Sequence, residues 1–496
     1  MNPGDFKAEF RAQPKAIVEG VLLLAEQVAK QPITSVPPRA FLAGGAVRDL
    51  ELGSTVTDAD VEVYGVPADD LRVLLEKLFP GRVHDVGSAF SVYKINLEDG
   101  TFLDVSLPRR ESKTGKGHKG FEVIGDPAMT VDEATRRRDF TMNALLADPL
   151  TGKVVDVFGG LVDIHQKMLR VVDATTFIDD PLRIYRALQF TARFELMPDP
   201  HTLTLMQQMV ERGDADELPK ERITEELRKW LLKAEKPSLG FQLARDIGIV
   251  QRDYPELYAL IDTPQEPEWH PEGDVWIHTL MVIDEAAHLI RSQEHSVPAQ
   301  DRITVMLGAL CHDVGKPAVT KVVDGRIRSH EHEAGGEDPA KSLLAHWTFG
   351  ADVEQGVIAI VKNHLKPGML MREVEKGAMT NEQYVNAVRR LLKKMYPLNW
   401  RTFLAACEAD WRGRDLSSVR GPYAAGQLFA DTVLREQLDA NPTKPLLRGE
   451  DLLALGLWPG KRIGEMIRTV EDARDAGDIT TKEQAAQLAK KLLREE

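Results

Sequence analysis

One segment, residues 41–63, constrains this chain more than any other part of the sequence. It begins with the apolar run 41–43, continues through the glycine pair Gly44 and Gly45, and then enters a run of helix-forming residues. Glycines between a strand and a helix let backbone N–H groups approach a phosphate, because no Cβ stands in the way. Arg48 adds a planar cationic group that can hold the same phosphate. The pattern predicts a strand, a phosphate-binding turn and a helix.

Two aspartates, Asp58 and Asp60, follow in a stretch that alternates between polar and apolar residues. A period of two places both carboxylates on one face of a strand. Such carboxylates repel each other unless a cation lies between them, and Mg²⁺ is commonly held by one or two carboxylates together with substrate phosphates. This arrangement is typical of metal-dependent nucleotidyl transfer. Asp104, on an expected strand at 101–106, is a candidate third carboxylate, with an ordinary acidic residue at a strand end as the alternative.

The order of these features points to a known family. Segment 41–63 resembles the signature of the nucleotidyltransferase superfamily that includes DNA polymerase β. More narrowly, GGAVRD followed by DxD resembles bacterial class II tRNA nucleotidyltransferases, the CCA-adding enzymes, and their poly(A) polymerase relatives. The resemblance implies that Mg²⁺ held by Asp58 and Asp60 activates the 3′-hydroxyl of an RNA, which attacks the α-phosphate of a nucleoside triphosphate. It also implies tRNA, CTP and ATP as partners.

A third motif lies at 133–146, which reads EATRRRDFTMNALL and resembles the RRDFTxNAL motif of the same family. We expect a helix here that carries three consecutive arginines. By position, Arg138 corresponds to the nucleotide-contacting arginine of the family. A basic, glycine-rich loop at 109–119 precedes this motif, and we expect it to contact the triphosphate or the RNA 3′ end, with a solvated loop as the alternative.

The run DDPLR at 179–183 resembles the EDxxR motif, whose Asp and Arg side chains hydrogen-bond the incoming base along its Watson–Crick edge. A carboxylate accepts from the exocyclic amino group of cytosine or adenine, and an arginine donates to the ring nitrogen or carbonyl. Asp180 and Arg183 hold those places here, and we expect Arg186, on the same helix face, to reach the phosphates. Asp179 stands where the family has Glu. The alternative is an N-capped helix with exposed charges.

Histidine and aspartate residues in the C-terminal half form a second candidate site. His278 lies in an amphipathic stretch, His312 and Asp313 are adjacent in LGALCHDVGKP, and Asp410 lies in AACEADWRGRD. A His-Asp doublet in an apolar helix suits a divalent metal, because imidazole and carboxylate both ligate such ions. Together these residues resemble the H…HD…D signature of HD phosphohydrolases, which implies a divalent transition metal.

Two later histidines, His332 and His364, are candidate ligands of a second metal, since some HD sites recruit two such residues. An ordinary surface or core histidine is the alternative for each. The resemblance implies cleavage of phosphoesters by a metal-activated water. In CCA-adding enzymes with such a domain it implies action on 2′,3′-cyclic phosphates, 2′-nucleotides and other phosphate esters.

Length and composition fit several domains in one globular chain. With 496 residues, 43% hydrophobic and 28% charged, the sequence is too long for one compact core. Two cysteines, Cys311 and Cys407, exclude a disulfide framework and indicate a reducing compartment, hence the cytoplasm. No apolar run is long enough to span a bilayer. The net charge of −14 argues against a chain coated by nucleic acid, but it leaves room for a local basic patch.

The hydrophobic period changes along the chain, and this predicts an α/β segment followed by blocks that are helical almost throughout. The resemblance implies that these form an α+β architecture: a polymerase-β-like nucleotidyltransferase α/β head, followed by an all-helical neck, an HD domain and a tail. In the head we expect strands at 41–43, 60–64, 92–97, 101–106 and 154–157, with a helix at 71–78. The expected domains are an N-terminal helical extension at 1–38 with one amphipathic helix over 1–31, the nucleotidyltransferase head at 39–165, a helical neck binding RNA and nucleotide at 166–262, a Pro-rich linker at 263–273, the HD phosphohydrolase domain at 268–420, and a helical tail at 421–496.

Three functions are compatible with these motifs. The first is a CCA-adding nucleotidyltransferase with an HD phosphohydrolase domain. The second is a poly(A) polymerase, or an enzyme adding only CC or only A, because these share every motif named above. The third, from a different class, is a catalytically inactive regulator that binds nucleotide or RNA. The intact residues Asp58, Asp60 and Arg48 count against a regulator, since a sensor has little need for the carboxylate pair.

Overall fold

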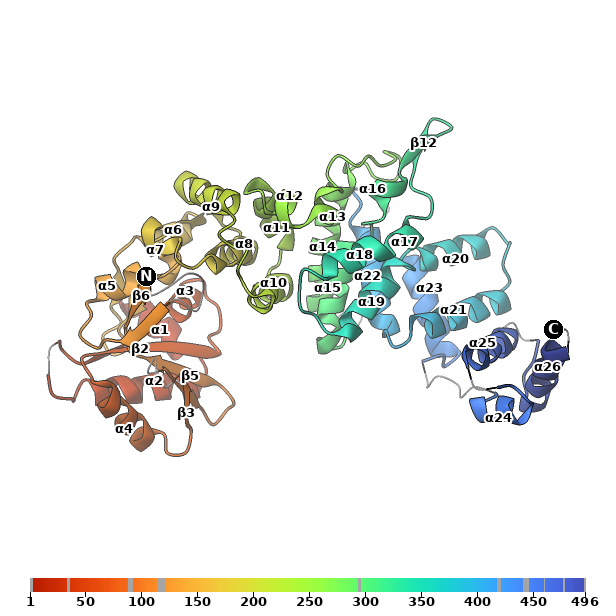
Figure 1. Ribbon diagram of the computed structural model, residues 1–496. Coiled ribbons are helices and arrows are strands. Elements are labelled where there is room, and N and C mark those ends of the chain that lie inside the picture. The colour runs from red at the N-terminus through yellow and green to blue at the C-terminus, as the bar shows by residue number, and fades with distance from the viewer. Residues whose placement is uncertain are drawn as a thin grey trace. The chain divides into compact units, whose positions relative to one another are not determined.

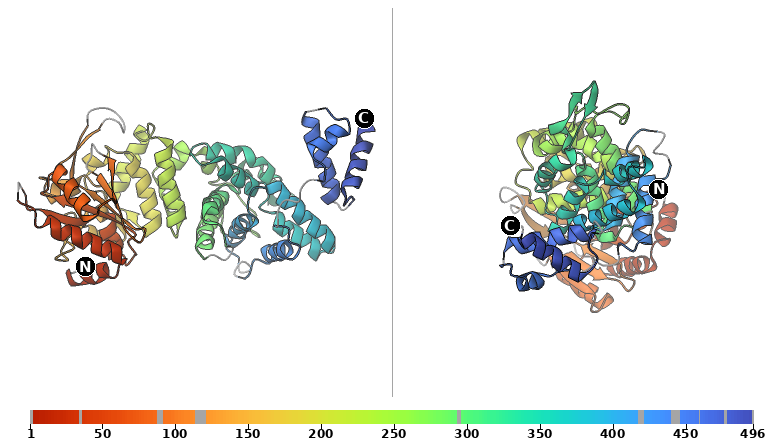
Figure 2. Two further views of the ribbon diagram at one scale, coloured as in Figure 1. Left: turned by 90° about the horizontal axis from the view of Figure 1, so that it is seen from below. Right: turned by 90° about the vertical axis from the view of Figure 1, so that its right-hand side faces the viewer.

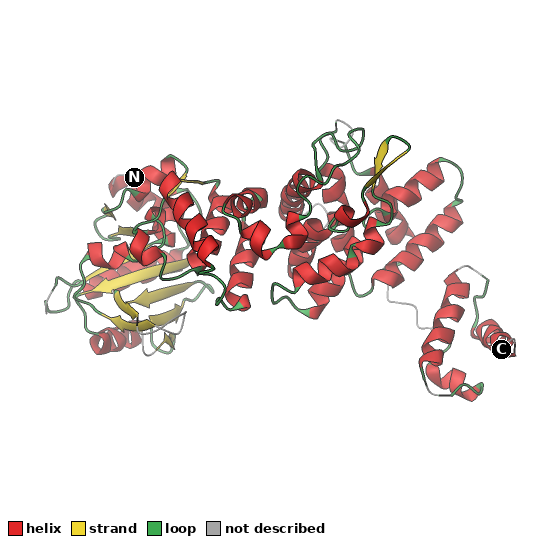
Figure 3. Cartoon of the chain, turned by 45° about the horizontal axis from the view of Figure 1, so that its top comes forward, coloured by secondary structure: helices red, strands yellow, loops and turns green. Residues whose placement is uncertain are grey.

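The computed structural model describes residues 3–33, 36–87, 92–113, 121–292, 296–416, 421–439, 446–458, 460–475 and 478–494. The chain divides into two compact units, Met1–Arg252 and Asp253–Glu496, which we describe separately. Most of the described strands lie in the N-terminal unit, and the C-terminal unit is helical apart from a short hairpin (Figure 1; Figure 3). None of the described helices is both long and apolar enough to cross a membrane.

A mixed sheet forms the core of the head. Its described strands, in spatial order, are β3 (Val83–Gly87), β4 (Val92–Asn96), β5 (Phe102–Ser106), β2 (Asp58–Tyr64), β1 (Arg39–Ala43), β8 (Leu145–Ala147) and β9 (Val154–Asp156). Neighbouring strands are antiparallel except β2 and β5, which run parallel. Three shorter strand pairings are formed by β6 (Arg109–Lys113) with β7 (Phe121–Gly125), β10 (Met168–Leu169) with β11 (Met197–Pro198), and β12 (Lys321–Val323) with β13 (Arg326–Arg328).

Helices surround this sheet and continue into the neck. The described helices up to the unit boundary are α1 (Pro3–Arg11), α2 (Lys15–Val28), α3 (Gly45–Glu51), α4 (Ala68–Leu78), α5 (Val131–Arg136), α6 (Gly160–His165), α7 (Ala174–Phe177), α8 (Leu182–Phe194), α9 (Pro200–Arg212), α10 (Lys220–Lys233), α11 (Pro237–Asp246) and α12 (Ile249–Asp253). In the neck, α10 and α11 both pack against α8. Helix α8 therefore links the head motifs to the helical neck.

Helix α2 covers one face of the head sheet (Figure 2). Its Gly20 lies against β5, since a Cβ built on this glycine would come within 3.2 Å of Leu103 Cδ1. Ala59 pairs with Leu103 across the parallel ladder, so both side chains point toward α2. Because side chains alternate along a strand, Asp58 and Asp60 point to the opposite face. The packing of α2 thus decides which face carries the carboxylates.

The strand predictions agree with the structure: each of the five predicted strands overlaps a described one, β1, β2, β4, β5 or β9. The prediction of one helix over residues 1–31 is wrong. The chain forms α1 and α2 with Pro14 between them, because proline lacks an N–H group and is not tolerated inside a helix. The sequence also missed β3, which reads VHDVG and is too polar to stand out, and β8.

The helix predicted over 133–146 is also wrong beyond its first turns. Helix α5 ends at Arg136, Arg137 is its C-cap, and Arg138 lies outside it. The chain then forms a short 3₁₀ turn at Thr141–Asn143 and enters strand β8. The side chain of Asp139 accepts hydrogen bonds from the Phe140 N–H and from Asn143 Nδ2, so tertiary and local polar contacts replace the helical ones.

The C-terminal unit is built around α14, α15, α19 and α22, which contact one another. Residues 263–273 do not form a free linker as predicted: Thr263 and Gln265 are buried, and Glu272 faces the core of this unit. Cys311 and Cys407 are free and buried. The described helices of the unit are α13 (Pro255–Tyr258), α14 (Val275–Ser292), α15 (Arg302–Cys311), α16 (Lys316–Val319), α17 (His332–Gly335), α18 (Glu337–Leu344), α19 (Ala351–Val361), α20 (Lys366–Glu375), α21 (Asn381–Met395), α22 (Trp400–Arg412), α23 (Ala424–Arg435), α24 (Gly449–Ala454), α25 (Lys461–Asp475) and α26 (Lys482–Arg494).

Two candidate active sites

Three carboxylates converge on the open face of the head sheet. Asp58 and Asp60 lie two residues apart on β2, and Asp104 on β5 is in register with Asp60 across the parallel ladder. Residues in register on neighbouring strands point to the same face, so Asp104 joins the predicted pair. The sequence predicted the first two from alternation. The third was a candidate without a decisive signal, because the pairing of β2 with β5 is a tertiary feature.

The pKa of Asp60 is raised to about 6. Partial burial of its carboxyl group is the main cause; Asp104, Asp58 and Glu62 raise it further, and Arg138 opposes the shift. The residue still keeps contact with solvent, so water screens part of this repulsion. Burial also raises the pKa of Asp104, with Lys94 opposing the shift. Asp58, Asp60 and Asp104 bring several carboxylate oxygens together, and the nearby positive charge does not balance them. Such a set of oxygen atoms fits a hard divalent cation such as Mg²⁺.

The glycine turn lies beside these carboxylates. Gly44 has φ +55° and ψ −111°, a conformation that side chains disfavour, and a Cβ there would collide with Nη1 of Arg138. Arg138 donates to the carbonyl oxygen of Asn143 at 3.2 Å, and its other terminal nitrogen lies 3.6 Å from Glu62 Oε2. The structure therefore brings Gly44, Arg138 and the carboxylates together, as the sequence predicted. Gly45 begins α3 directly after the turn.

Arg48 is buried, whereas the sequence analysis expected it to be open to a phosphate. It is 5% exposed, donates to Asn143 Oδ1 at 2.6 Å and contacts Asp49. Its guanidinium carbon also lies 4.5 Å from the ring centre of Phe194 and 5.4 Å from that of Phe190, both on α8. Arg48 thus joins the glycine turn to the neck through hydrogen bonds and cation–π contacts. Its contact with a phosphate stays a prediction.

The polar groups of the candidate base-reading motif are engaged within the protein. Arg183 donates to the carbonyl oxygens of Thr176 at 2.9 Å and Arg137 at 2.5 Å. Asp180 accepts from the Leu182 N–H, and its second oxygen lies 3.4 Å from Nη2 of Arg222. These contacts hold the start of α8 against the arginine-rich motif of the head. The base contacts of Asp180 and Arg183 stay predictions.

Arg186 differs from its expected place near the phosphates, because its guanidinium pairs with Asp139 at 2.7 Å. Burial alone raises the pKa of Asp139, but Arg186 and the hydrogen bond from Asn143 outweigh burial and hold the pKa below its ordinary value. This pair has a clear structural role, and a phosphate contact for Arg186 stays a prediction. Of the basic loop at 109–119, the structure describes the strand β6, and residues 114–119 lie outside the described part of the chain.

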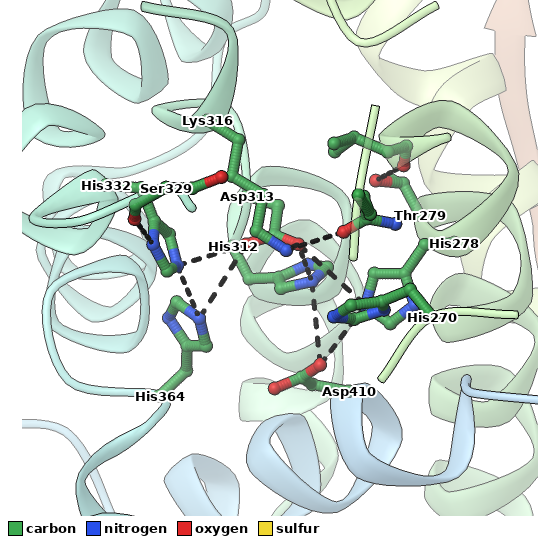
Figure 4. Close-up of polar contacts among 12 residues, drawn as sticks. His270, His278, Thr279, His312, Asp313, Lys316, Ser329, His332, His364 and Asp410 are labelled. Atoms are coloured by element: carbon green, nitrogen blue, oxygen red, sulfur yellow. Dashed lines mark hydrogen bonds and ion pairs between the residues drawn. The ribbon is translucent and has the colours of Figure 1, made fainter. Parts of the chain in front are cut away.

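The second site lies in the C-terminal unit, where helices α14, α17 and α22 and the segments that follow α15 and α19 bring its candidate ligands together (Figure 4). His278 on α14, His312 after α15 and Asp410 on α22 form one group: Nε2 of His278 lies 3.2 Å, and Nε2 of His312 3.8 Å, from Asp410 Oδ1. His332 and His364 form a second group with Asp313, whose Oδ1 lies 3.3 Å and 3.9 Å from their Nε2 atoms. All six predicted residues are buried and converge.

Asp313 lies between the two groups and can bridge two cations (Figure 4). Its Oδ1 faces the second group, and its Oδ2 lies 3.1 Å from Nε2 of His312. Nε2 of His312 and Oδ1 of Asp313 are buried but make no hydrogen bond of good geometry within the described structure, while Oδ2 of Asp313 forms an ion pair with Lys316 Nζ at 2.6 Å. Unsatisfied buried polar atoms are costly, and a metal ion would satisfy them. The residues present therefore fit one or two divalent metals with mixed nitrogen and oxygen ligands.

The histidine rings are oriented for metal binding. Nδ1 of His312, His332 and His364 each lies 2.8–2.9 Å from a backbone carbonyl oxygen, that of Ala309, Ser329 and Val361 respectively. Nδ1 therefore carries the proton, and the lone pair of Nε2 faces the site. Burial lowers the pKa of His364 to about 4, which keeps its ring neutral and able to ligate.

Glu272, in the segment predicted to be a linker, orients the first ligand. Its Oε1 accepts from Nδ1 of His278 at 2.9 Å and lies 2.8 Å from Nδ1 of His270. Lys316 places its Nζ 2.6 Å from Asp313 Oδ2 and donates to Gln265 Oε1 at 2.7 Å. The sequence analysis quoted Lys316 only as part of the segment LGALCHDVGKP, and it missed Glu272, His270 and Gln265. The only local signal was the group of polar and charged residues just before α14.

The site opens into a cavity of about 580 Å³. Its lining includes the candidate ligands Asp313, His332, His364 and Asp410, together with three arginines and Trp269. A cavity of this size accommodates a small phosphorylated molecule. The candidate ligands therefore line an open cavity, unlike the residues of a closed structural metal site.

The difference in stability between the wild type and an Asp60→Asn variant should depend on pH, because other acidic side chains crowd the carboxyl group of Asp60. In the folded protein the pKa of Asp60 is about 6 rather than 3.8, so the folded state binds a proton more readily than the unfolded state between these values. The charged carboxylate therefore costs stability above pH 6, and this cost disappears below about pH 4. With EDTA present, Asp60→Asn should stabilise the protein by about 1 kcal/mol at about pH 8, after allowance for solvent screening, and by nothing below about pH 4. Thermal unfolding of both proteins measures this.

Asp69→Asn, at the exposed start of α4, is the matched control and should show no such pH dependence. An Asp60→Asn variant that melts at or below the wild-type temperature at the higher pH would contradict the repulsion.

Removal of the charge on Glu272 should weaken metal binding. Glu272→Gln keeps the shape of the side chain but weakens the acceptor that orients His278, so affinity for Mn²⁺ or Ni²⁺ should fall roughly 10- to 100-fold. Calorimetric titration of the metal-free protein measures the dissociation constant. Glu268→Gln is the control on the same segment, because Glu268 pairs with Arg326 near the surface and should leave metal binding unchanged. Equal affinities for the Glu272→Gln variant and the wild type would show that Glu272 does not support the ligand.

Known protein families match three parts of this chain. Residues 40–170 match the poly A polymerase head domain, residues 196–260 match the probable RNA and SrmB-binding site of polymerase A, and residues 275–396 match the HD domain. These matches cover the head sheet with its carboxylates, the neck helices, and the segment that holds most ligands of the second site.

Whole-chain relatives agree with these matches. The chain is 36% identical over 377 residues to the multifunctional CCA protein of Methylobacillus flagellatus, which covers 76% of this chain and 84% of that protein. It is 35% identical over 419 residues to the multifunctional CCA protein of Burkholderia mallei, at 83% and 94% coverage.

Solved structures share the fold at low identity. A CCA-adding enzyme in complex with CTP superposes with a TM-score of 0.60 at 19% identity, covering 98% of this chain and 97% of that one. The Thermotoga maritima CCA-adding enzyme complexed with tRNA gives 0.57 at 19% identity, with 99% of each chain covered. From the identity to full-length relatives and the domain matches together, the chain belongs to the CCA-adding nucleotidyltransferase family, in the multifunctional form that carries an HD domain.

Proposed function

We propose that this protein adds C, C and A, taken from CTP and ATP, to the 3′ ends of tRNA. We further propose that its HD site hydrolyses phosphoesters such as 2′,3′-cyclic phosphates. The observation that carries the transferase proposal is the carboxylate cluster of Asp58, Asp60 and Asp104 beside the Gly44 turn and Arg138. Relatives named multifunctional CCA proteins, and solved CCA-adding enzymes in complex with CTP, ATP and tRNA, support these partners. Such a role in tRNA processing would place the protein in the cytoplasm.

In this proposal Asp58 and Asp60 hold Mg²⁺, with Asp104 in register beside them. When bound, Mg²⁺ would lower the pKa of the attacking 3′-hydroxyl and stabilise charge on the pyrophosphate. Gly44 leaves the backbone open to the triphosphate, and Arg138 next to it neutralises phosphate charge. These residues occupy one face of the sheet, so the nucleotide and the RNA end would meet over the parallel strands β2 and β5.

Base selection in this proposal belongs to Asp180 and Arg183 at the start of α8. Cytosine and adenine both carry an exocyclic amino group that a carboxylate can accept from, while uracil and guanine present a carbonyl there. Their present bonds to Arg222, Thr176 and Arg137 would exchange for bonds to the base. Arg48 and Arg186 would act close to the phosphates, because their contacts hold the head against α8.

Hydrolysis in the second site would rest on His278, His312, Asp313 and Asp410, with His332 and His364 for a second ion. A bound divalent transition metal would supply a water or hydroxide nucleophile near neutral pH. Lys316, beside Asp313, places a positive charge next to the ligand that bridges the groups. The 580 Å³ cavity above these residues gives the phosphoester access.

Replacing Asp60 with Ala should abolish nucleotide incorporation and leave the fold intact. The substrate is tRNA without its terminal CCA, with radiolabelled CTP and ATP supplied singly and together. Loss of a metal ligand should cost on the order of 10³-fold or more in rate, while Asp69→Ala retains wild-type rates. Unchanged turnover of the Asp60→Ala variant would end the assignment.

The same assay separates the related activities. Two C additions followed by one A support CCA addition. Addition of A alone in long runs indicates a poly(A) polymerase, and addition of only CC or only A indicates a partial enzyme. A wild-type protein that binds nucleotide but incorporates none would indicate a regulator.

Substitutions in the HD site should abolish hydrolysis and leave nucleotide addition at the transferase site unchanged. A variant with His312→Ala and Asp313→Ala loses one ligand from each metal group, so metal-dependent hydrolysis of 2′,3′-cyclic AMP should fall below detection. CCA addition should continue, because both residues belong to the C-terminal unit. A double variant that still hydrolyses the cyclic phosphate at the wild-type rate would refute the proposed hydrolase.

A further inference from the structure

Trp269 lines the cavity of the HD site and is unusually exposed. The cavity of about 580 Å³ joins this side chain to the ligands Asp313, His332 and His364. Trp269 has 46% of its surface in contact with solvent, whereas Trp276, a few residues later, is 2% exposed. An indole ring of this exposure contributes little to the core. Its place beside a metal site calls for another explanation.

The segment that carries Trp269 is anchored on both sides. Before it, Gln265 Oε1 accepts from Lys316 Nζ at 2.7 Å, and Glu266 Oε2 accepts from the Ile327 N–H on β13 at 2.9 Å. After it, Glu272 holds Nδ1 of His278 at 2.9 Å. Each anchor connects to a metal ligand or to a wall of the cavity. The structure therefore presents the indole on a fixed support, which lowers the entropy lost when a ligand binds to it.

Positive side chains line the same cavity. Lys316, Arg328, Arg372 and Arg414 contribute to it, alongside the acidic residues Glu266, Glu331 and Glu333. Lys316 and Arg414 already face Asp313 and Asp410, at 2.6 Å and 3.6 Å. Within the described part of the chain, no carboxylate lies within ion-pair distance of Arg328 or Arg372. These two arginines are thus available for a phosphate that is not on the metals.

We propose that Trp269 is a stacking platform for the base of a ribonucleotide whose scissile phosphate lies on the HD metal ligands, with Arg328 and Arg372 holding the neighbouring phosphate when that ribonucleotide is the end of an RNA. Aromatic rings stack on any nucleobase, because every base has a π-face. The inference rests on the proposed phosphoesterase function of this site and names its substrate class: phosphoesters that carry a base, either free nucleotides or RNA ends, in preference to base-free phosphates.

The test compares substrates with and without a base, using the full-length protein loaded with Mn²⁺ or Ni²⁺. The probes are 2′,3′-cyclic AMP, a short RNA ending in a 2′,3′-cyclic phosphate, and glycerol 1,2-cyclic phosphate, which has the same reacting ring but no base. Trp269→Ala should raise KM for the base-bearing substrates roughly 5- to 150-fold, with kcat nearly unchanged. It should leave the glycerol compound unaffected, and Trp269→Phe should restore most of the loss.

Trp458→Ala is the matched control, because Trp458 is 87% exposed but does not line the cavity, and it should change none of these constants. If KM rises for only one of the two base-bearing substrates, that substrate shows whether the bound base comes from a free nucleotide or from an RNA end. Equal losses on all three substrates would show a merely structural role and overturn the proposal, as would no change on any of them.

Failure of the hydrolase proposal can be told apart from failure of the platform. If the wild type cleaves none of the probes, calorimetry with adenosine 2′-monophosphate and ribose 5-phosphate takes the place of kinetics. Weaker binding of the adenosine compound alone to Trp269→Ala would still support the platform. Binding of both compounds that is unaffected by the substitution would overturn it.

Discussion

A buried chain of polar contacts joins the head to the neck, and the geometry of the transferase site depends on it. Arg186 on α8 pairs with Asp139, Asp139 accepts from Asn143, and Asn143 accepts from Arg48 beside the glycine turn. Arg48 then packs on the ring of Phe194, which returns to α8. Loss of one member would leave a buried charge or amide without a partner, at a typical cost of about 3–5 kcal/mol for a charge. The chain of contacts thus holds the Gly44 turn against helix α8.

The two sites treat negative charge in different ways. In the head, Asp58, Asp60 and Asp104 crowd one face of a sheet, and their mutual repulsion favours a hard cation together with a triphosphate. In the C-terminal unit, buried carboxylates alternate with histidines whose Nδ1 atoms lie at hydrogen-bond distance from backbone carbonyl oxygens. That arrangement suits a softer metal with mixed ligands. The two sets of side chains therefore fit different kinds of divalent cation.

The HD site also depends on residues that look unremarkable in isolation. Glu272 bonds both His270 and His278, and Gln265 reaches Asp313 through Lys316. These residues lie in a proline-rich stretch that predicts a linker, because its side chains are polar and lack periodicity. They are buried because each meets a partner on another element. The same anchors position Trp269, so ligand geometry and the shape of the cavity wall are coupled.

The amino-acid sequence by itself predicted the α+β head, the positions of most of its strands, the carboxylate pair and the six residues that converge in the C-terminal unit. Alternation of polar and apolar residues and short motifs mark these strands, the carboxylate pair and each of the six residues locally, although the six residues lie far apart along the chain. Only the tertiary structure decided that Asp104 stands opposite Asp60, that Arg186 pairs with Asp139, and that Glu272 orients His278. The first depends on which strands pair, and the second depends on the packing of a neck helix against the head. Glu272 lies only six residues before His278, but its role depends on a turn that no local pattern specifies.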